Sequence, residues 1–400
     1  MTLNNEKQLS LAQKLFSIYN EDKYKVINIL GLKIKIDFLT PYIKKVRKNY
    51  GIDKNKIVFV NYLGSGYGCN PKYITEELLK RKLPYEIVWI SNAPAKNFPD
   101  GVRVVPYSPK KTLFELVTSK IWIDNYHKNS FIKRGLDKSP EQKYIQTWHG
   151  SLGIKKIEKN ADCLTNDSKW LDYAIKNSKM TDYWISNSDF EDNIYKEAFW
   201  EVNNIKKFGH PRNDIFFKDN LDIIKKVKSM YNISDDTKIA LYAPTFREDE
   251  KISHYDLNFN NLKKNLAEKF GGNWILMVRL HTRLQEVFKE YFKNKNDIIN
   301  VTNYPDMQEL LVAADVGITD YSSWMFDYML SKKPVFIYAE DIEQYNTERG
   351  FYYPLEETPF SIARNNEELS KNIQNFDNEK YIENVDKFLK DKGCMEDGHA

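Results

Sequence analysis

Four polar clusters stand out in the 400-residue chain, because each follows an apolar run typical of a buried strand. They are Trp148-His149, Thr245–Arg247, His281–Arg283 and Thr319–Ser323. In open α/β sheets the ligand lies at the carboxyl ends of the strands, near a switch point in the strand order. We therefore expect these clusters to converge on one crevice and to bring histidine, arginine and hydroxyl groups into it.

The turn Asp320-Tyr-Ser-Ser323 is the most informative of these clusters. It lies between an apolar run, Val312 to Ile318, and a helical pattern, Trp324 to Leu330. A helix start offers free backbone N–H groups and a positive dipole end, so serine hydroxyls at this point predict a phosphate seat. The alternative is an ordinary N-cap at a strand-to-helix junction. Because histidines end the matching strands, we favour the phosphate seat.

Two successive cycles of strand and helix position these clusters and predict parallel sheets with crossover helices. We expect an α/β fold with two Rossmann-like domains facing a central cleft. The predicted domains are residues 1–55, 56–215 and 216–400. Predicted strands span 56–63, 85–91, 102–107, 121–125, 143–147, 183–186, 238–242, 274–280, 298–301 and 335–338, and predicted helices span 72–82, 113–118, 189–199, 221–231, 257–270, 306–313 and 324–330.

Residues 1–55 are predicted to form a basic, amphipathic appendage. Leu9 to Tyr19 fits a short amphipathic helix, Lys23 to Ile36 is basic and β-branched, and Lys44 to Lys48 adds a basic cluster. One interpretation is an anchor on an anionic membrane surface. The other is a packing arm with a solvated basic face.

Composition excludes several classes of protein. The net charge of +4 is too small for a dedicated nucleic-acid binder, and the mean hydropathy of −0.62 indicates a soluble protein. No apolar run approaches the roughly 18 residues of a spanning helix, and we expect no signal peptide. The three cysteines lie far apart without zinc-ligand spacing, so we expect a reducing cytoplasm and no bound metal. Gly64-Ser-Gly-Tyr-Gly68 matches neither a dinucleotide fingerprint nor a Walker A loop.

Five motifs resemble the CDP-glycerol glycerophosphotransferase family, in that family's order and across about residues 56 to 390. Members of that family polymerise or prime teichoic acids and polyol-phosphate capsules. The resemblance implies a GT-B-like fold, with an N-terminal acceptor domain (56–215) and a C-terminal nucleotide-donor domain (216–400). The motifs are Thr147-Trp-His-Gly150, Phe208-Gly-His-Pro-Arg-Asn-Asp214, Leu241-Tyr-Ala-Pro-Thr-Phe-Arg247, Arg279-Leu-His281 and Ile318-Thr-Asp-Tyr-Ser-Ser323.

The resemblance implies roles for individual residues. His149 is the predicted general base, since an imidazole with an ordinary pKa near ~6.5 suits that task. His281, the second predicted catalytic residue, is assigned to the donor pyrophosphate. The alternatives are a satisfied core histidine and a strand-end packing residue. The predicted donor and phosphate ligands are Asp320, Tyr321, Ser322, Ser323, Arg247, Thr245, Arg279 and Arg349, with Asp320 orienting a cation or a histidine.

The predicted reaction transfers glycerol phosphate from CDP-glycerol to a hydroxyl of a polymeric or lipid-linked acceptor and releases CMP. It acts in teichoic-acid or capsule synthesis, at the inner face of the plasma membrane. No cofactor is required, and an Mg²⁺ dependence is left open. The alternatives are CDP-ribitol as the donor, an NDP-sugar glycosyltransferase that releases NDP, and a carbohydrate-binding scaffold without turnover.

Overall fold

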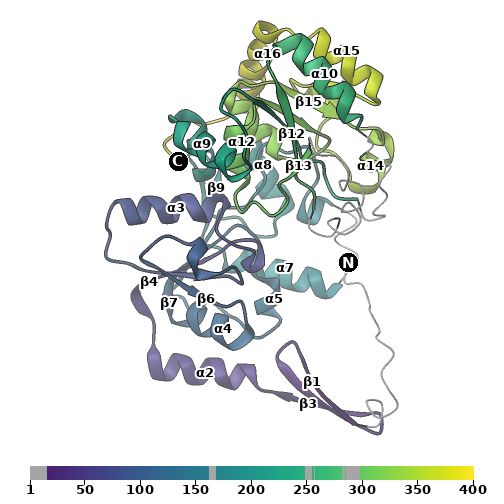
Figure 1. Ribbon diagram of the computed structural model, residues 1–400. Helices are drawn as coiled ribbons and strands as arrows, with labels where there is room; N and C mark the ends of the chain where they lie inside the picture. The colour runs from purple at the N-terminus through teal and green to yellow at the C-terminus, as the bar shows by residue number, and fades with distance from the viewer. Residues whose placement is uncertain (1–15, 162–167, 248–254, 256, 282–283, 285–297) are drawn as a thin grey trace. The chain divides into compact units, whose positions relative to one another are not determined.

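The computed structural model describes residues 16–161, 168–247, 255, 257–281, 284 and 298–400 (Figure 1). Two compact units divide the described residues. The first contains residues 16–66, 78–146 and 168–182, and the second contains 67–77, 147–161 and those from 183 onward. The predicted domains, 1–55, 56–215 and 216–400, stay a prediction, while the compact units group residues 183–215 with the C-terminal part of the chain.

The first unit is built on parallel strands in the order β8-β7-β4-β5-β6. Successive residues of β4 are buried on both faces, as parallel strands covered by helices require. Val58 packs into a core with Leu116 of α4, and Phe59 stacks on Trp89 with ring centroids 5.7 Å apart. The strands are β4 (Asp53–Val60), β5 (Glu86–Ile90), β6 (Val102–Val105), β7 (Ser119–Asp124) and β8 (Lys143–Gln146), and the helices of this part of the chain are α3 (Cys69–Lys80), α4 (Pro109–Thr118), α5 (Asn129–Ile132) and α7 (Ser168–Met180).

An antiparallel three-stranded sheet precedes α2 (Leu39–Tyr50) and consists of β1 (Phe16–Glu21), β2 (Tyr24–Ile29) and β3 (Leu32–Asp37). The helix predicted for Leu9 to Tyr19 is wrong over residues 16–19, which form β1, and residues 9–15 lie outside the described residues. In β1 apolar and polar side chains begin by alternating, which suits a strand. Asp22, with a φ of 52°, then turns the chain so that β1 pairs with β2.

The second unit contains a parallel sheet in the order β13-β12-β11-β14-β15-β16 and the parallel pair β9 and β10. Its strands are β9 (Tyr183–Ser186), β10 (Ile205–Lys207), β11 (Lys238–Tyr242), β12 (Trp274–Val278), β13 (Ile298–Asn300), β14 (Val316–Thr319), β15 (Val335–Tyr338) and β16 (Ser361–Ala363). Its helices are α8 (Asp189–Ala198), α9 (Leu221–Met230), α10 (Phe259–Phe270), α12 (Met307–Ala313), α13 (Trp324–Tyr328), α14 (Ile342–Arg349), α15 (Asn366–Gln374) and α16 (Asn378–Asp391).

Strand residues of the six-stranded sheet alternate between two cores. Leu241 and Ile337 belong to the core formed with α9, α12 and α16, whereas Tyr242 and Phe336 belong to the core formed with α10 and α15. Figure 1 shows α10 and α15 side by side over the same sheet. The predicted α/β class is confirmed, and the predicted strands lie within a few residues of the observed ones.

The strand-to-helix junction at β14 differs slightly from its prediction. The predicted helix Trp324 to Leu330 is observed as α13, which then tightens into a 3₁₀ turn, η7 (Met329–Ser331). Lys332 ends it in the left-handed conformation, with a φ of 60°. In the part of the chain that the structure describes, no helix is long and apolar enough to cross a membrane.

Gly317 lets α13 lie close against β14. A Cβ atom at Gly317 would approach Trp324 Cη2 to 2.9 Å and Tyr328 Cε1 to 3.0 Å, closer than packed atoms tolerate. Both rings are buried and hydrogen-bonded, since Trp324 Nε1 donates to the Ala243 carbonyl at 2.8 Å. The sheet and the helix that flank the Asp320 turn are therefore held together at this glycine.

We expect Gly317→Ala to lower the free energy of unfolding by about 1–3 kcal/mol, because overpacking forces buried rings to shift. Chemical denaturation measures this. Gly153→Ala is the control, since its Cβ would lie 3.5 Å from Ser323 Cβ, an ordinary contact. Equal stabilities of the two variants would contradict the close packing.

Candidate functional site

Three of the four polar clusters leave the same edge of the six-stranded sheet. Tyr242 at the end of β11 lies opposite Val278 of β12 and Ile318 of β14. The segments that carry Thr245, His281 and Asp320 therefore begin side by side, as their positions after parallel strands predict.

A buried guanidinium joins these segments. Arg247 is 7% exposed, and its Nη1 lies 2.9 Å from an Asp320 oxygen, while Nε and Nη2 bind both oxygens of Asp341 at 2.7 and 3.0 Å. Asp320 also accepts the backbone N–H of Thr245 at 2.8 Å. Burial alone would lower the pKa of Arg247, but Asp320 and Asp341 raise it above its ordinary value. Arg247 is therefore a fixed positive charge that is bound to Asp320.

Two tyrosines form a platform beneath this guanidinium. The Tyr321 and Tyr345 rings stack with centroids 4.2 Å apart and an interplanar angle of 17°. Arg247 Cζ lies 4.9 and 4.7 Å from the two centroids, within cation–π distance. The Tyr321 hydroxyl donates to Asp341 at 2.9 Å. The only polar side-chain atom of this predicted ligand is therefore bound to Asp341.

The two serines of the turn keep their hydroxyls available. Ser322 and Ser323 are half-buried, and Ser323 makes no side-chain capping bond to α13, which is five residues long. Among the described residues neither hydroxyl has a hydrogen-bond partner, so the N-cap alternative is not realised by a side-chain bond. Thr245 Oγ1 is likewise buried without a partner. The turn and the segment after β11 therefore offer three hydroxyls without a hydrogen-bond partner among the described residues.

His149 reaches this region on a separate loop of the same unit. The preceding Trp148 adopts a positive φ of 51°, which is rare and costly for a bulky residue. Asn70 Nδ2 holds this backbone by donating to the carbonyls of Thr147 at 3.1 Å and Trp148 at 3.3 Å. His149 is half-buried, and its ring lies 4.4 Å from that of Trp148. The loop then approaches the serine turn, because Gly153 packs against Ser323.

The remaining predicted ligands are distributed around the sheet edge. His281 is exposed, with its ring 4.7 Å from that of Phe246, and Arg279 donates to the Tyr304 carbonyl at 2.7 Å. Arg349 ends α14 and is half-buried; its charge opposes the burial that raises the pKa of Glu158 to about 7. Arg283 lies outside the described residues.

A second buried ion pair, which our sequence analysis left without a chemical role, braces α13. Arg212 Nε and Nη2 bind Asp327 at 2.8 and 3.0 Å, and Asn213 and Gln308 donate to the same carboxylate at 3.1 and 2.9 Å. Asp327 could have indicated this ion pair in the sequence, because a carboxylate among the apolar positions of a buried helix needs a partner.

His210 supports the loop that carries His149. Its ring is fully buried, with Nε2 2.9 Å from Glu191 and Nδ1 3.4 Å from Asn70. Because Asn70 holds the carbonyls before His149, these contacts form a chain of support for that loop. Asn70, Asp341 and Lys155 are absent from the predicted site residues.

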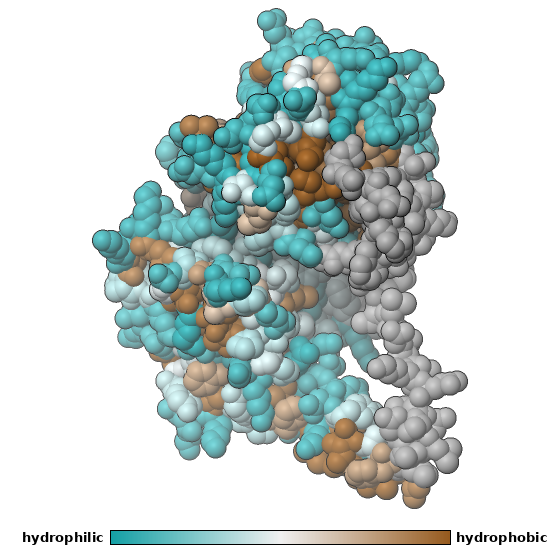
Figure 2. All heavy atoms as spheres, in the orientation of Figure 1, coloured by the Kyte–Doolittle hydropathy of each residue, from teal (hydrophilic) through white to brown (hydrophobic). Residues whose placement is uncertain are grey.

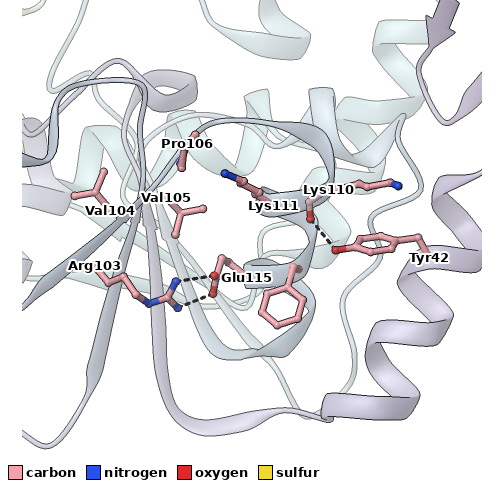
Figure 3. Close-up of a pocket in the computed structure, with 9 residues that line it drawn as sticks. Tyr42, Arg103, Val104, Val105, Pro106, Lys110, Lys111 and Glu115 are labelled. Atoms are coloured by element: carbon pink, nitrogen blue, oxygen red, sulfur yellow. Dashed lines mark hydrogen bonds and ion pairs between the residues drawn. The ribbon is translucent and has the colours of Figure 1, made fainter.

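No predicted site residue lines the cavity of about 410 Å³ in the first unit (Figure 3). There Arg103 forms two hydrogen bonds with Glu115, at 2.8 and 2.9 Å, and Tyr42 donates to the Lys110 carbonyl at 3.2 Å. The candidate site is therefore the edge of the second unit's sheet and not this cavity. Among the residues that the structure describes, no cluster of His, Cys, Asp and Glu could hold a metal ion.

Known proteins resemble this chain over most of its length. The chain is 31% identical over 369 residues to the teichoic acid glycerol-phosphate transferase of Staphylococcus aureus (strain NCTC 8325), which covers 87% of this chain and 91% of that protein. It is 30% identical over 365 residues to the teichoic acid poly(glycerol phosphate) polymerase of Staphylococcus epidermidis (strain RP62A). That match covers 88% of this chain but spans only 50% of the polymerase.

A solved structure of the wall teichoic acid polymerase TagF superposes with a TM-score of 0.77 at 29% identity, over 90% of this chain and 89% of that one. This likeness confirms the predicted GT-B-like class. The family model for CDP-glycerol:poly(glycerophosphate) glycerophosphotransferase matches residues 42–400, which include all five motifs. The chain belongs to the CDP-glycerol:poly(glycerophosphate) glycerophosphotransferase family.

Proposed function

We propose that this protein transfers glycerol phosphate from CDP-glycerol to a hydroxyl of a teichoic-acid-type polymer and releases CMP. The family match and the names of its relatives support the reaction. The structural observation that carries it is the meeting of two segments within the second unit. The loop of His149 packs through Gly153 against the Ser322–Ser323 turn, so a proton acceptor and free phosphate ligands belong to one compact unit.

In the proposed mechanism, His149 accepts the proton of the acceptor hydroxyl. The oxygen attacks the phosphorus that carries glycerol, the bond from that phosphorus to the bridging oxygen breaks, and CMP leaves with that oxygen. Ser322 and Ser323 donate to phosphate oxygens, and His281 and Arg349 supply positive charge or hydrogen bonds to the diphosphate. Arg247 acts through Asp320, because its own donors are already bound to carboxylates.

We propose that the transfer requires no cofactor, and an Mg²⁺ dependence remains open. The residues described here offer phosphate ligands that are hydroxyl, imidazole and guanidinium groups, which neutralise charge without a metal. Parallel assays with EDTA and with added Mg²⁺ test this: unchanged CMP release in EDTA supports the proposal, and complete loss restored by Mg²⁺ contradicts it.

The reaction is tested by offering CDP-glycerol, CDP-ribitol and UDP-glucose in parallel, each with a poly(glycerol phosphate) oligomer, and assaying the nucleotide released. CMP from CDP-glycerol is the expected result. CMP from CDP-ribitol alone would identify the other polyol, and UDP from UDP-glucose would identify a glycosyltransferase. No turnover with any donor would favour a binding protein.

We expect His149→Ala to lower kcat by about 10²–10⁴-fold with little change in the affinity for CDP-glycerol, because loss of a general base affects proton transfer more than donor binding. CMP release and calorimetric binding measure the two quantities. His399→Ala is the control, since His399 is exposed near the C-terminus. Full activity of the His149 variant would remove His149 from the mechanism.

We also propose that the protein works at the inner face of the plasma membrane on a lipid-linked acceptor of teichoic-acid or capsule type. The β1–β3 sheet supports this through its register. Rows of opposed residues place Phe16, Ile18, Ile29, Leu32, Ile34 and Ile36 on one face, and these side chains are 43–67% exposed. Figure 2 shows brown side chains gathered on this hairpin. The following helix, α2, has four basic residues and no acidic one, which suits anionic lipid.

We expect Leu32→Asp and Ile34→Asp to weaken binding to phosphatidylglycerol vesicles by at least about tenfold each, because burial of one large apolar side chain contributes about 1.5–3 kcal/mol. Vesicle sedimentation at low and high salt measures this. Tyr19→Asp is the matched control, because Tyr19 is exposed on the opposite face of the same sheet. Equal binding by all three variants would contradict the membrane surface.

A further inference from the structure

A short β-bridge fixes the chain six residues after His149. Lys155 lies opposite Phe351 in an antiparallel bridge. The Tyr352 N–H donates to the Ile154 carbonyl at 2.7 Å, and the Lys156 N–H donates to the Gly350 carbonyl at 3.0 Å. Gly350 permits this approach, because it adopts a φ of +78° and a Cβ there would lie 2.8 Å from Lys156 Cδ. The backbone of Lys155 is therefore held in a defined position.

This position borders the platform of the candidate site. The Phe351 ring lies 5.5 Å from that of Tyr321 and 6.0 Å from that of Tyr345. Those two rings carry Arg247, whose guanidinium is bound to Asp320. The bridge at Lys155 therefore connects the loop of His149 with the residues around the serine turn.

The Lys155 ammonium lacks a partner of opposite charge. Among the described residues it makes no hydrogen bond and no ion pair. Burial lowers its pKa to about 8; Asp320 opposes this shift, while Arg349 and Arg247 add to it. Asp320 is already bound by Arg247 and by the Thr245 N–H. Arg247 also binds Asp341, and Glu158 interacts with Arg349, so neither of these carboxylates is paired with Lys155.

Lys155 is half-buried, and an ammonium held beside other cations without an ion pair of its own favours the binding of an anion. Its two cationic neighbours make the requirement stronger, since each adds repulsion that only negative charge relieves. A diphosphate would supply that charge between the serine turn and the loop of His149. Lysine suits this task as a compact point charge with three donors.

We propose that Lys155 binds the diphosphate of the donor, with Nζ donating to an anionic oxygen of the leaving phosphate. This assignment rests on the proposed function and adds a residue to its donor site. In the transfer step, Lys155 stabilises the negative charge that collects on CMP as the bond to the bridging oxygen breaks. It neither gives nor takes a proton in that step.

Binding of CDP-glycerol, CMP and inorganic pyrophosphate by wild type, Lys155→Met and Lys159→Met tests the proposal. Met preserves the length of the side chain, and Lys159 is an exposed lysine of the same segment. We expect Lys155→Met to weaken CDP-glycerol and pyrophosphate binding by about tenfold or more, the usual cost of losing one member of a buried charge pair. Lys159→Met should stay close to wild type.

Thermal stability without ligand separates a binding role from a structural one. Removing a half-buried charge that has no ion pair should leave the Tm of Lys155→Met equal to or above that of wild type. A lower Tm together with weaker binding would indicate a structural lysine and overturn the proposal. Unchanged CDP-glycerol binding by Lys155→Met would overturn it too, whereas failure of wild type to bind CDP-glycerol at all would overturn the proposed function instead.

The pH dependence gives a second readout. Because the ammonium loses its charge as the pH rises through about 8, wild-type affinity for pyrophosphate should fall between pH 7 and about 9. The facing groups Asp320, Arg349 and Arg247 are of types that keep their charge across this range. Lys155→Met should lack that decline. A decline of the same size in the variant would assign it to another group and contradict the proposal.

Discussion

The ion pairs of Arg247 with Asp320 and Asp341 are the interactions on which the candidate site depends. They connect the segment after β11, the turn after β14 and the start of α14, which are far apart in the sequence. A buried guanidinium is costly to desolvate, and its contacts with Asp320, with both oxygens of Asp341 and with the stacked tyrosines offset that cost. The guanidinium nitrogens of Arg247 and the Tyr321 hydroxyl are bound within the protein. The groups left over, such as the serine hydroxyls and the Lys155 ammonium, are therefore the ones available to a ligand.

The sheet edge could be predicted from the sequence, because its signals are local. Apolar runs of three to five residues mark β11, β12 and β14, and parallel strands must end at one edge, so Thr245, His281 and Asp320 were expected together. The ion-pair partners could not be predicted in this way. Asp341 lies 94 positions after Arg247, and the sequence around neither residue indicates that the two form an ion pair. Lys155 and Lys159 likewise look alike in sequence, and only the bridge to Phe351 separates them.

Dependence on distant residues also explains why the helix predicted for Leu9 to Tyr19 is wrong over residues 16–19. Leu9 to Tyr19 contains apolar residues that fit a helical face, but over residues 16–19 a strand is equally compatible with the pattern. Pairing with β2 decides between them, and that pairing depends on residues 24–29 rather than on the segment itself. The limits of the compact units likewise depend on contacts between residues that are far apart in the sequence. The loop of His149 follows β8 of the first unit directly, yet it belongs to the same compact unit as residues 67–77 and those from 183 onward.

The placement of the His149 loop in the second unit affects how the candidate site is organised. Proton transfer was assigned to the N-terminal half of the sequence and phosphate binding to the C-terminal half. Residues 147–161 nevertheless belong to the second unit, where Asn70 holds the strained backbone before His149 and residues 350–352 fix the segment of Lys155. The loop that carries His149 and Lys155 thus belongs to the unit that holds the serine turn. The spacing between His149, the proposed base, and the serine hydroxyls, the proposed phosphate ligands, is then set by packing inside one unit.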